Sequence, residues 1–261
     1  MTDLDLAVIG NCQIGALLDR SARVVWACVP RFDGDPAFCS LLNGDGEAEA
    51  GYYDVELEGC TRSEQRYLPN TAVVETLLHD ANGGGVKIVD FAPRFERHRR
   101  FFRPTMLIRI VTPLAGRPHV RMRLRPLGAY GAVRPTLTHG SNHIRYVLPG
   151  MTLRLTTDVS ITAMLEERAF VLDHAVALVL GPDGGDGGGR SDARRGLELR
   201  RVAIVQRECD VLVLEQRAGM RGDPTLEQRP RRRERGRVLR VTDEPGRRAS
   251  LRAVNAGHRQ A

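Results

Sequence analysis

The amino-acid sequence predicts an all-β fold, an antiparallel β-sandwich with one short helix, followed by a basic tail of low order. Short apolar runs recur along residues 1–180, separated by Gly, Pro, Asn and Asp, as expected for strands joined by turns. Composition changes near Gly181, because every Phe, Tyr and Trp lies before it. We therefore divide the chain into a sandwich domain, residues 1–180, and a Gly/Arg-rich tail, residues 181–261, which is disordered or read out of frame.

Strands are predicted wherever apolar residues alternate or cluster between turn residues. The clearest case is the run from Val120 to Arg125, where every second residue is apolar, the period of a strand with one face in the core. Strands spaced this closely favour a sandwich over an α/β sheet. The predicted strands are residues 5–9, 23–29, 52–58, 63–68, 72–78, 86–91, 106–112, 119–126, 143–148, 152–157, 160–166 and 168–180.

The short helix is predicted over residues 35–42. Asp35 can cap its N-terminus, and Pro36 then takes the first helical position, where its missing N–H costs nothing.

A glycine-containing segment near the N-terminus looks like a nucleotide-binding loop, but it lacks the residues that such a loop requires. The dinucleotide fingerprint needs glycine where Cys12 stands, and no Gly-Lys-Ser/Thr follows. Only seven residues separate Gly15 from the strand that begins at Arg23, too few for a parallel crossover. We expect this segment to turn back as an antiparallel strand pair.

The segment from Trp26 to Asp33 carries the only Trp of the chain and runs into Pro30, which ends a strand because it has no N–H. Arg31, Phe32 and Asp33 then lie on a loop. From the residues alone, Trp26 and Phe32 are core side chains and Arg31 with Asp33 forms a local ion pair. The alternative is a loop that faces a partner domain or a sugar.

No catalytic, cofactor-binding or metal-ligating set is predicted. Adjacent carboxylates, such as Glu166 with Glu167, have no context that would desolvate one of them, so solvated surface acids are expected. His139 and His143 are separated by a Gly-Ser-Asn turn, and the cysteines show no zinc spacing. Ser141 lacks the elbow motif of serine hydrolases.

The net charge of +7 lies wholly in the tail, since residues 181–261 hold 19 Arg and 12 acidic residues. The arginine run at residues 229–235 could bind phosphates, but no aromatic residue accompanies it, so a nucleic-acid partner is not predicted. The N-terminus lacks a basic segment followed by a long apolar run. We therefore expect no signal peptide, no membrane span and a cytoplasmic location with free thiols.

Five sequence blocks stand in order along residues 1–180. They are Ile9-Gly10-Asn11-Cys12 with Ala16-Leu17-Leu18; Val25-Trp26-Ala27-Cys28-Val29-Pro30-Arg31-Phe32-Asp33 with Pro36-Ala37-Phe38; Tyr67-Leu68-Pro69-Asn70-Thr71-Ala72-Val73-Val74-Glu75-Thr76; Val89-Asp90-Phe91-Ala92-Pro93-Arg94; and Ile108-Arg109-Ile110-Val111 with Gly116-Arg117, Met122-Arg123-Leu124-Arg125-Pro126 and Tyr130-Gly131. Together they resemble the N-terminal domain of the trehalase and glucoamylase-like enzymes of glycoside hydrolase family 15.

This resemblance implies a β-supersandwich that packs against an (α/α)6 barrel. In the family, the barrel carries two catalytic glutamates and inverts the anomeric centre when α-glucosidic bonds in trehalose or maltooligosaccharides are cleaved. The chain departs from the family after the sandwich, where Gly and Arg replace the barrel sequence. We expect it to be a truncated enzyme, inactive alone and needing no cofactor. Trp26, Arg31, Phe32 and Asp33 are the candidate domain interface or pocket rim.

Two alternatives stay open. The chain could instead be a stand-alone module that binds a carbohydrate or a separately encoded barrel. The tail could be a genuine basic extension, although a frameshift in a GC-rich gene explains its Arg and Gly content. The coding bias of a GC-rich genome also explains why Lys87 is the single Lys of the chain.

Overall fold

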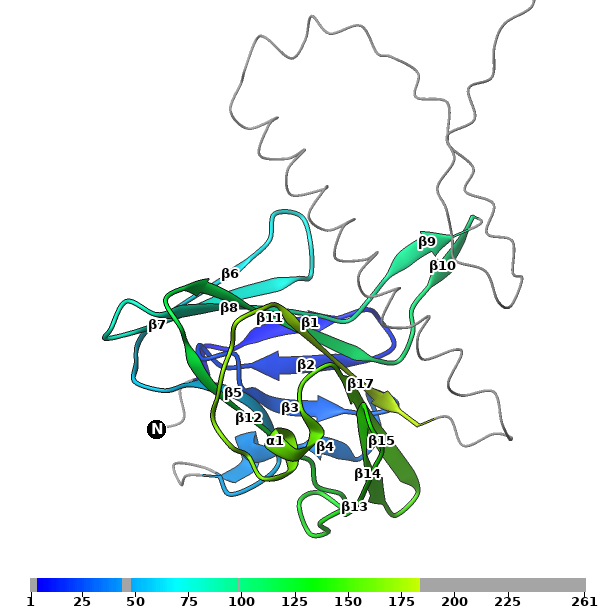
Figure 1. Cartoon of the computed structure of the whole chain (residues 1–261). Coiled ribbons are helices and arrows are strands. Elements are labelled where there is room, and N and C mark those ends of the chain that lie inside the picture. The colour runs from blue at the N-terminus through cyan, green and yellow to red at the C-terminus, as the bar shows by residue number, and fades with distance from the viewer. Residues whose placement is uncertain (1–3, 44–47, 98, 184–261) are drawn as a thin grey trace, which may run out of the picture. The chain divides into compact units, whose positions relative to one another are not determined.

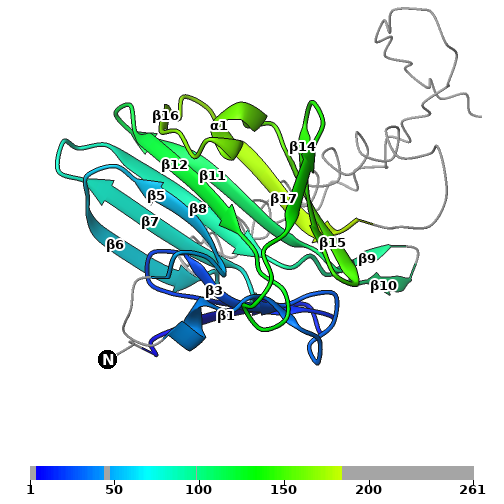
Figure 2. The same cartoon turned by 90° about the horizontal axis from the view of Figure 1, so that it is seen from below.

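The computed structural model describes residues 4–43, 48–97 and 99–183 and confirms the predicted all-β fold. Two antiparallel sheets pack face to face (Figures 1 and 2). The seven-stranded sheet has the order β1-β2-β3-β5-β12-β16, with β4 paired to β3. Its strands are β1 (Ala7–Gly10), β2 (Gly15–Leu18), β3 (Val24–Cys28), β4 (Pro36–Phe38), β5 (Tyr52–Leu57), β12 (His119–Arg125) and β16 (Phe170–Val171).

The eight-stranded sheet has the order β13-β14-β15-β17-β11-β8-β7-β6. Its strands are β6 (Cys60–Tyr67), β7 (Val74–Asp80), β8 (Gly85–Phe91), β11 (Leu107–Ala115), β13 (Thr136–His139), β14 (His143–Leu148), β15 (Met151–Thr157) and β17 (Val176–Pro182). A separate hairpin joins β9 (Phe95–Arg97) to β10 (Arg100–Phe102), and the two short helices are η1 (Ser40–Asn43) and α1 (Ile161–Leu165).

The main core lies between the two sheets and follows the predicted alternation. In β12, Val120, Met122 and Leu124 are buried, whereas the arginines between them lie on the opposite face of the strand, as a strand's two-residue period requires. In Figure 2, β5 and β12 lie in front of β7 and β8, the strands that they cover. The predicted pairing at the N-terminus is also confirmed, because β1 and β2 run antiparallel with Ile9 opposite Ala16.

The eight-stranded sheet has a second apolar cluster on its other face. Phe91, Ile108 and Val179 are opposite one another on β8, β11 and β17 and are all buried. They belong to a cluster separate from the main core. These three strands are therefore apolar on both faces, which is why their sequences read as continuous apolar runs rather than as strict alternation.

The predicted helix over residues 35–42 is wrong. Pro36–Phe38 is strand β4, which pairs with β3, and only the turn from Ser40 to Asn43 is helical. The side chain of Phe38 is fully buried in the main core. Helix capping and propensity depend only on residues that are adjacent in the sequence. Here the burial of the strand in the folded protein outweighs that local preference.

The strand predicted over residues 160–166 is also wrong, because helix α1 occupies this segment. The hydroxyl of Ser160 accepts a hydrogen bond from the backbone N–H of Ala163, which caps the helix. Ile161 and Met164 are buried one turn apart on the same face. The strand predicted over residues 168–180 is divided into β16 and β17, and β9, β10 and β13 were not predicted.

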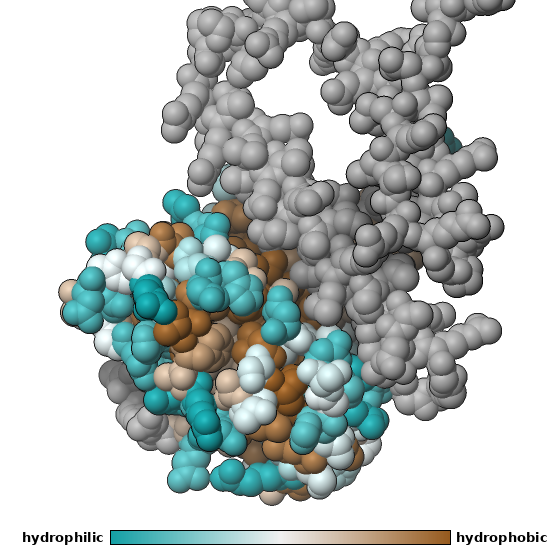
Figure 3. Space-filling model, in the orientation of Figure 1, coloured by the Kyte–Doolittle hydropathy of each residue, from teal (hydrophilic) through white to brown (hydrophobic). Residues whose placement is uncertain are grey.

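In the face seen in Figure 3, apolar residues form a band through the middle of the described part, with hydrophilic residues on either side. Among the described residues, no helix is long and apolar enough to cross a bilayer. Strand β17 runs to Pro182, and Asp183 pairs with Arg145 and Arg154. The rest of the predicted tail, including the arginine run at residues 229–235, lies outside the described residues.

Candidate functional site

The loop that follows β3 presents the predicted ion pair at the surface. Nε and Nη2 of Arg31 donate hydrogen bonds of 2.8 Å to Oδ1 and Oδ2 of Asp33, the parallel geometry in which a guanidinium binds a carboxylate best. Both side chains are largely exposed. The hydrogen bonds from Arg31 hold the pKa of Asp33 below its usual range, so this carboxylate is ionised at neutral pH. The local ion pair is confirmed.

The two aromatic residues of this segment have different surroundings. Trp26 is half-buried and packs against the cluster formed by Cys39, Ala50 and Leu127, as a core residue is expected to do. Phe32 is 57% exposed, so its interpretation as a core residue is wrong. Its ring lies close to the backbone of β2, because a Cβ atom added to Gly15 would be 2.8 Å from Cε1 of Phe32.

Asp35 joins this loop to a second loop at residues 127–134. Its carboxylate accepts hydrogen bonds from the backbone N–H groups of Ala129 and Tyr130, the latter at 2.7 Å. Ala129, Tyr130 and Gly131 have φ angles of 49°, 52° and 97°, a left-handed conformation that is costly for residues with a Cβ. The carboxylate of Asp35 therefore stabilises a backbone conformation that the second loop would not readily adopt alone.

Tyr130 stands at the tip of the second loop with 67% of its surface exposed. It borders a hollow of about 480 Å³ whose lining mixes apolar and polar groups, with Glu49 paired to Arg134 at 3.4 Å. The hollow is lined by Cys39, Leu42, Asn43, Glu49, Ala50, Leu127, Tyr130, Gly131 and Arg134. We call this hollow, together with Arg31, Phe32, Asp33 and Asp35, the loop surface.

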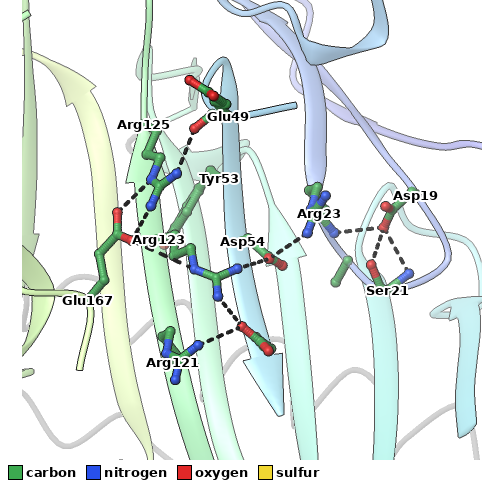
Figure 4. A network of polar contacts seen from close by, with 12 residues as sticks. Asp19, Ser21, Arg23, Glu49, Tyr53, Asp54, Arg121, Arg123, Arg125 and Glu167 are labelled. Atoms are coloured by element: carbon green, nitrogen blue, oxygen red, sulfur yellow. Dashed lines mark hydrogen bonds and ion pairs between the residues drawn. The ribbon is translucent and has the colours of Figure 1, made fainter. Parts of the chain in front are cut away.

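A second hollow of about 550 Å³ lies over the outer face of the seven-stranded sheet. Its charged groups already take part in ion pairs, with one another or with neighbouring residues (Figure 4). Nε of Arg125 donates a 2.7 Å hydrogen bond to Glu167, and Arg123 pairs with both Glu56 and Glu167. Arg23, which immediately precedes β3, donates a hydrogen bond of 3.0 Å to Asp54 on β5. This face is a continuous ladder of ion pairs across β3, β5 and β12.

The predicted absence of a catalytic carboxylate pair can be examined at Glu166 and Glu167. Glu166 pairs with Arg168, and Glu167 pairs with Arg125. Both carboxylates are therefore engaged by neighbouring arginines.

His139 and His143 lie on β13 and β14, on either side of the predicted turn, where the N–H of Gly140 donates to the carbonyl oxygen of His143. In the ranges that the structure describes, no group of three or more His, Cys, Asp or Glu side chains could hold a metal ion.

Sequence reasoning identified Arg31, Phe32 and Asp33 and missed Asp35 and Tyr130 as parts of the same surface. Asp35 is 95 residues from Tyr130, so no local pattern relates them. The one available signal was that Tyr130-Gly131 closes the series of sequence blocks that the chain shares with a known family.

The comparisons with known proteins point to one family. The family described as "Trehalase-like, N-terminal" matches residues 4–160. The chain is 26% identical to a trehalase of Mycolicibacterium smegmatis over 178 residues, which cover 60% of this chain and 26% of that protein. It is 30% identical to trehalase 1 of Sulfolobus acidocaldarius over 146 residues, which cover 55% of this chain and 23% of that protein.

A trehalase of Mycobacterium tuberculosis gives a similar match, with 26% identity over 179 residues that cover 60% of this chain and 26% of that protein. The chain thus matches about a quarter of the length of these relatives. No solved structure gives a significant match.

Proposed function

The chain belongs to the family of trehalase-like N-terminal domains, and we propose that it is the non-catalytic sandwich domain of a hydrolase of α-glucosidic bonds, in trehalose or maltooligosaccharides. In this proposal the chemistry is done by an (α/α)6 barrel, and the sandwich supports that barrel and shapes the rim of its sugar pocket. The loop surface is the proposed contact.

The state of the carboxylates supports a non-catalytic role. A general acid for glycoside hydrolysis needs a raised pKa and access to the sugar. Asp33 is accessible, but its pKa is lowered by Arg31. The pKa of Asp90 is raised by burial, but Asp90 lies in the core beside Arg109, where no sugar reaches it.

The loop surface supports the contact. Phe32 and Tyr130 are large aromatic side chains that are more than half exposed, and the Arg31–Asp33 pair beside them is already formed. Aromatic residues and arginine are enriched at protein interfaces. Because Asp35 fixes one loop to the other, the surface loses little conformational entropy on binding.

The first test is whether the purified chain releases glucose from trehalose or maltotriose. We expect no release above the blank, because loss of a general acid and base costs orders of magnitude in rate. Hydrolysis by the chain alone would contradict the proposal.

The second test transfers this domain into a relative. Residues 1–183 would replace the matched segment of the M. smegmatis trehalase, and trehalose hydrolysis would be compared with the intact enzyme and with the enzyme lacking that segment. We expect the chimera to hydrolyse trehalose faster than the enzyme that lacks the segment. Phe32→Ser in the chimera should remove that gain. Leu114→Ser, which changes an exposed apolar residue away from the loop surface, serves as the matched control. A chimera no better than the deleted enzyme contradicts the contact.

A second candidate function is a stand-alone carbohydrate-binding module. The hollow beside Tyr130 favours it, because an exposed aromatic ring stands there among Asn43, Glu49 and Arg134, and sugar sites combine an apolar face with polar groups. Titration calorimetry with trehalose and maltotriose tests it. Saturable binding that Tyr130→Ala abolishes would favour the module over a domain that needs a barrel.

We further propose that residues beyond the sandwich are read out of frame. Resequencing the gene through the codon of Gly181 and translating all three frames tests this. The proposal is supported if another frame continues with an aromatic-rich helical sequence that contains paired glutamates. It is contradicted if the new reading gives the same residues beyond Gly181 and no other frame continues in this way, a result that favours the binding module.

A further inference from the structure

The β9–β10 hairpin belongs to neither large sheet and projects from the body of the protein (Figures 1 and 2). The two strands are antiparallel, with Phe95 opposite Phe102 and Arg97 opposite Arg100. Pro93 and Pro104 flank the hairpin on its two sides. The loop surface of the proposed function does not include the hairpin, so a role for the hairpin is independent of that function.

A buried asparagine holds the base of this hairpin. Nδ2 of Asn11 donates to the carbonyl oxygens of Pro93 at 2.9 Å and Pro104 at 2.8 Å. Its Oδ1 accepts from the backbone N–H groups of Gln13 and Ile14. Asn11 is 1% exposed, so its whole amide is used to join the two ends of the hairpin to the turn after β1. The hairpin therefore leaves the body at a fixed position.

The hairpin is strongly basic, whereas the rest of the domain is acidic. Residues 94–103 contain five Arg and one acidic residue, and the remaining residues of 1–180 contain 15 basic and 19 acidic residues. Among the described residues, thirteen arginines outside the hairpin form ion pairs with carboxylates.

The exposed arginines of the hairpin differ from these thirteen. Within the part of the chain that the structure describes, no carboxylate pairs with any of them. They are Arg94, Arg99, Arg100 and Arg103.

Aromatic rings accompany these charges. The rings of Phe95 and Phe102 stack with their centroids 5.6 Å apart, and the guanidinium of Arg94 lies 5.5 Å from the centroid of Phe101. Phe101 is 63% exposed and Phe102 is 42% exposed. Two exposed rings on an arm only three residues long per strand have no role in the core and lower solubility unless a partner covers them.

We propose that the β9–β10 hairpin is a docking arm for an acidic protein surface. Carboxylates of the partner would pair with the four exposed arginines, and apolar groups of the partner would cover Phe101 and Phe102. Arginine and phenylalanine are both enriched at protein interfaces, and arginine binds carboxylates in a bidentate manner. Carboxylates are the counter-ions of the paired arginines elsewhere in this domain. By charge complementarity, we therefore expect the partner to offer carboxylates to the unpaired arginines of the hairpin.

Nucleic acid and membrane fit the hairpin less well. Bases bind single-strand modules by stacking on open aromatic faces, and here one face of Phe102 is covered by Phe95 and one face of Phe101 by Arg94. Insertion of the two exposed rings into a bilayer would bring neighbouring arginines toward the apolar layer, which is unfavourable.

The test measures binding of the full chain to four probes in about 150 mM salt, where exposed charges are screened beyond roughly 8 Å. The probes are poly-L-glutamate, a random copolymer of glutamate and tyrosine, single-stranded oligothymidylate, and vesicles of phosphatidylcholine with phosphatidylserine. The hairpin variant carries Arg94→Gln, Arg99→Gln, Arg100→Gln and Arg103→Gln. The charge-matched control carries Arg229→Gln, Arg231→Gln, Arg232→Gln and Arg233→Gln, which removes the same charge from outside the described residues.

We expect the chain to bind the copolymer more tightly than poly-L-glutamate, because the tyrosines can cover the exposed rings. The hairpin variant should lose about tenfold in affinity for the copolymer, the effect of removing several exposed ion pairs, while the control stays within about twofold. Phe101→Ser with Phe102→Ser should remove the preference for the copolymer. Thermal melts of all variants establish that the sandwich remains folded.

Three results would overturn the proposal. One is an equal loss in the hairpin variant and the control, which would mean that net charge alone decides binding. Another is hairpin-dependent binding that is tighter to oligothymidylate or to vesicles than to the copolymer. The third is no measurable binding of the unmodified chain to either acidic polymer.

Discussion

Nε of Arg109 on β11 lies 2.7 Å from Oδ1 of Asp90 on β8, with both side chains almost completely buried in the core. The same guanidinium donates to the carbonyl oxygens of Ala22, in the connection before β3, and of Tyr53, on β5 of the other sheet. It lies 4.2 Å from the centroid of the Tyr53 ring. A charged pair inside an apolar core therefore connects the two sheets, and the two backbone carbonyls accept hydrogen bonds from the terminal nitrogens of Arg109.

Replacement of one partner alone should be more damaging than replacement of both. Arg109→Met leaves a buried carboxylate without its counter-ion, so we expect a loss of about 3–5 kcal/mol in the free energy of unfolding. Arg109→Met with Asp90→Leu removes both charges and should recover a substantial part of that loss. Urea unfolding of Arg109→Met, of Asp90→Leu and of the double variant measures this. A double variant as unstable as the sum of the two single variants would contradict the role of the pair.

The fold was predictable where each strand has a local pattern. Alternation in β12 shows directly which residues face the core, and the short distance between Gly15 and Arg23 excludes a parallel crossover. The helix predicted at Asp35 was wrong because capping signals are also local, and here the carboxylate binds a distant loop. The hairpin was not predicted, because arginines interrupt its apolar residues.

The candidate site was likewise predictable only where its contacts join residues that are close in the sequence. The Arg31–Asp33 pair joins residues two positions apart, so sequence alone could find it. The exposure of Phe32 could not be found in this way, because it depends on where Gly15 lies in the folded sheet. The relationship between Asp35 and Tyr130 depends on the packing of two loops that are far apart in the sequence, and composition and periodicity contain no information on it.

The pH dependence of the loop ion pair follows from its geometry. Hydrogen bonds from Arg31 lower the pKa of Asp33 in the folded protein. Such a group stabilises the folded loop fully above its unfolded pKa, about 4, and this contribution is lost as the pH falls through the lower folded pKa. Carbon-13 NMR should show Asp33 titrating below a reference peptide, and Arg31→Ala should restore the reference value. An unchanged titration in Arg31→Ala would show that the pair does not persist in solution.

The two-loop arrangement should depend on the carboxylate of Asp35. Asp35→Ala removes the acceptor for the N–H groups of Ala129 and Tyr130, which then lack compensation for their left-handed backbone. We expect a loss of about 1–3 kcal/mol and faster hydrogen exchange at these two amides. Asp33→Asn, on the same loop but without contact to these amides, should leave their exchange unchanged. Equal exchange in Asp35→Ala and the unmodified chain would show that the second loop holds its conformation without Asp35.

The position of the hairpin should depend on Asn11 more than on any residue of the hairpin itself. Asn11→Ala removes two donated and two accepted hydrogen bonds at a buried site, and we expect a loss of about 2–4 kcal/mol in stability, as for other buried groups left unpaired. The arm would then leave the body without a fixed base. Limited digestion with trypsin, which cuts after arginine, should therefore cleave Asn11→Ala within residues 94–103 several times faster than the unmodified chain.

Asn142→Ala, at the turn between β13 and β14, provides a control with the same side-chain change and should leave the cleavage rate at the hairpin unaltered. If Asn11→Ala instead unfolds the whole sandwich, cleavage will accelerate at all arginines together, and the hydrogen bonds of Asn11 would be a requirement for the fold rather than for the arm. Equal cleavage of the hairpin in Asn11→Ala and the unmodified chain would contradict both roles.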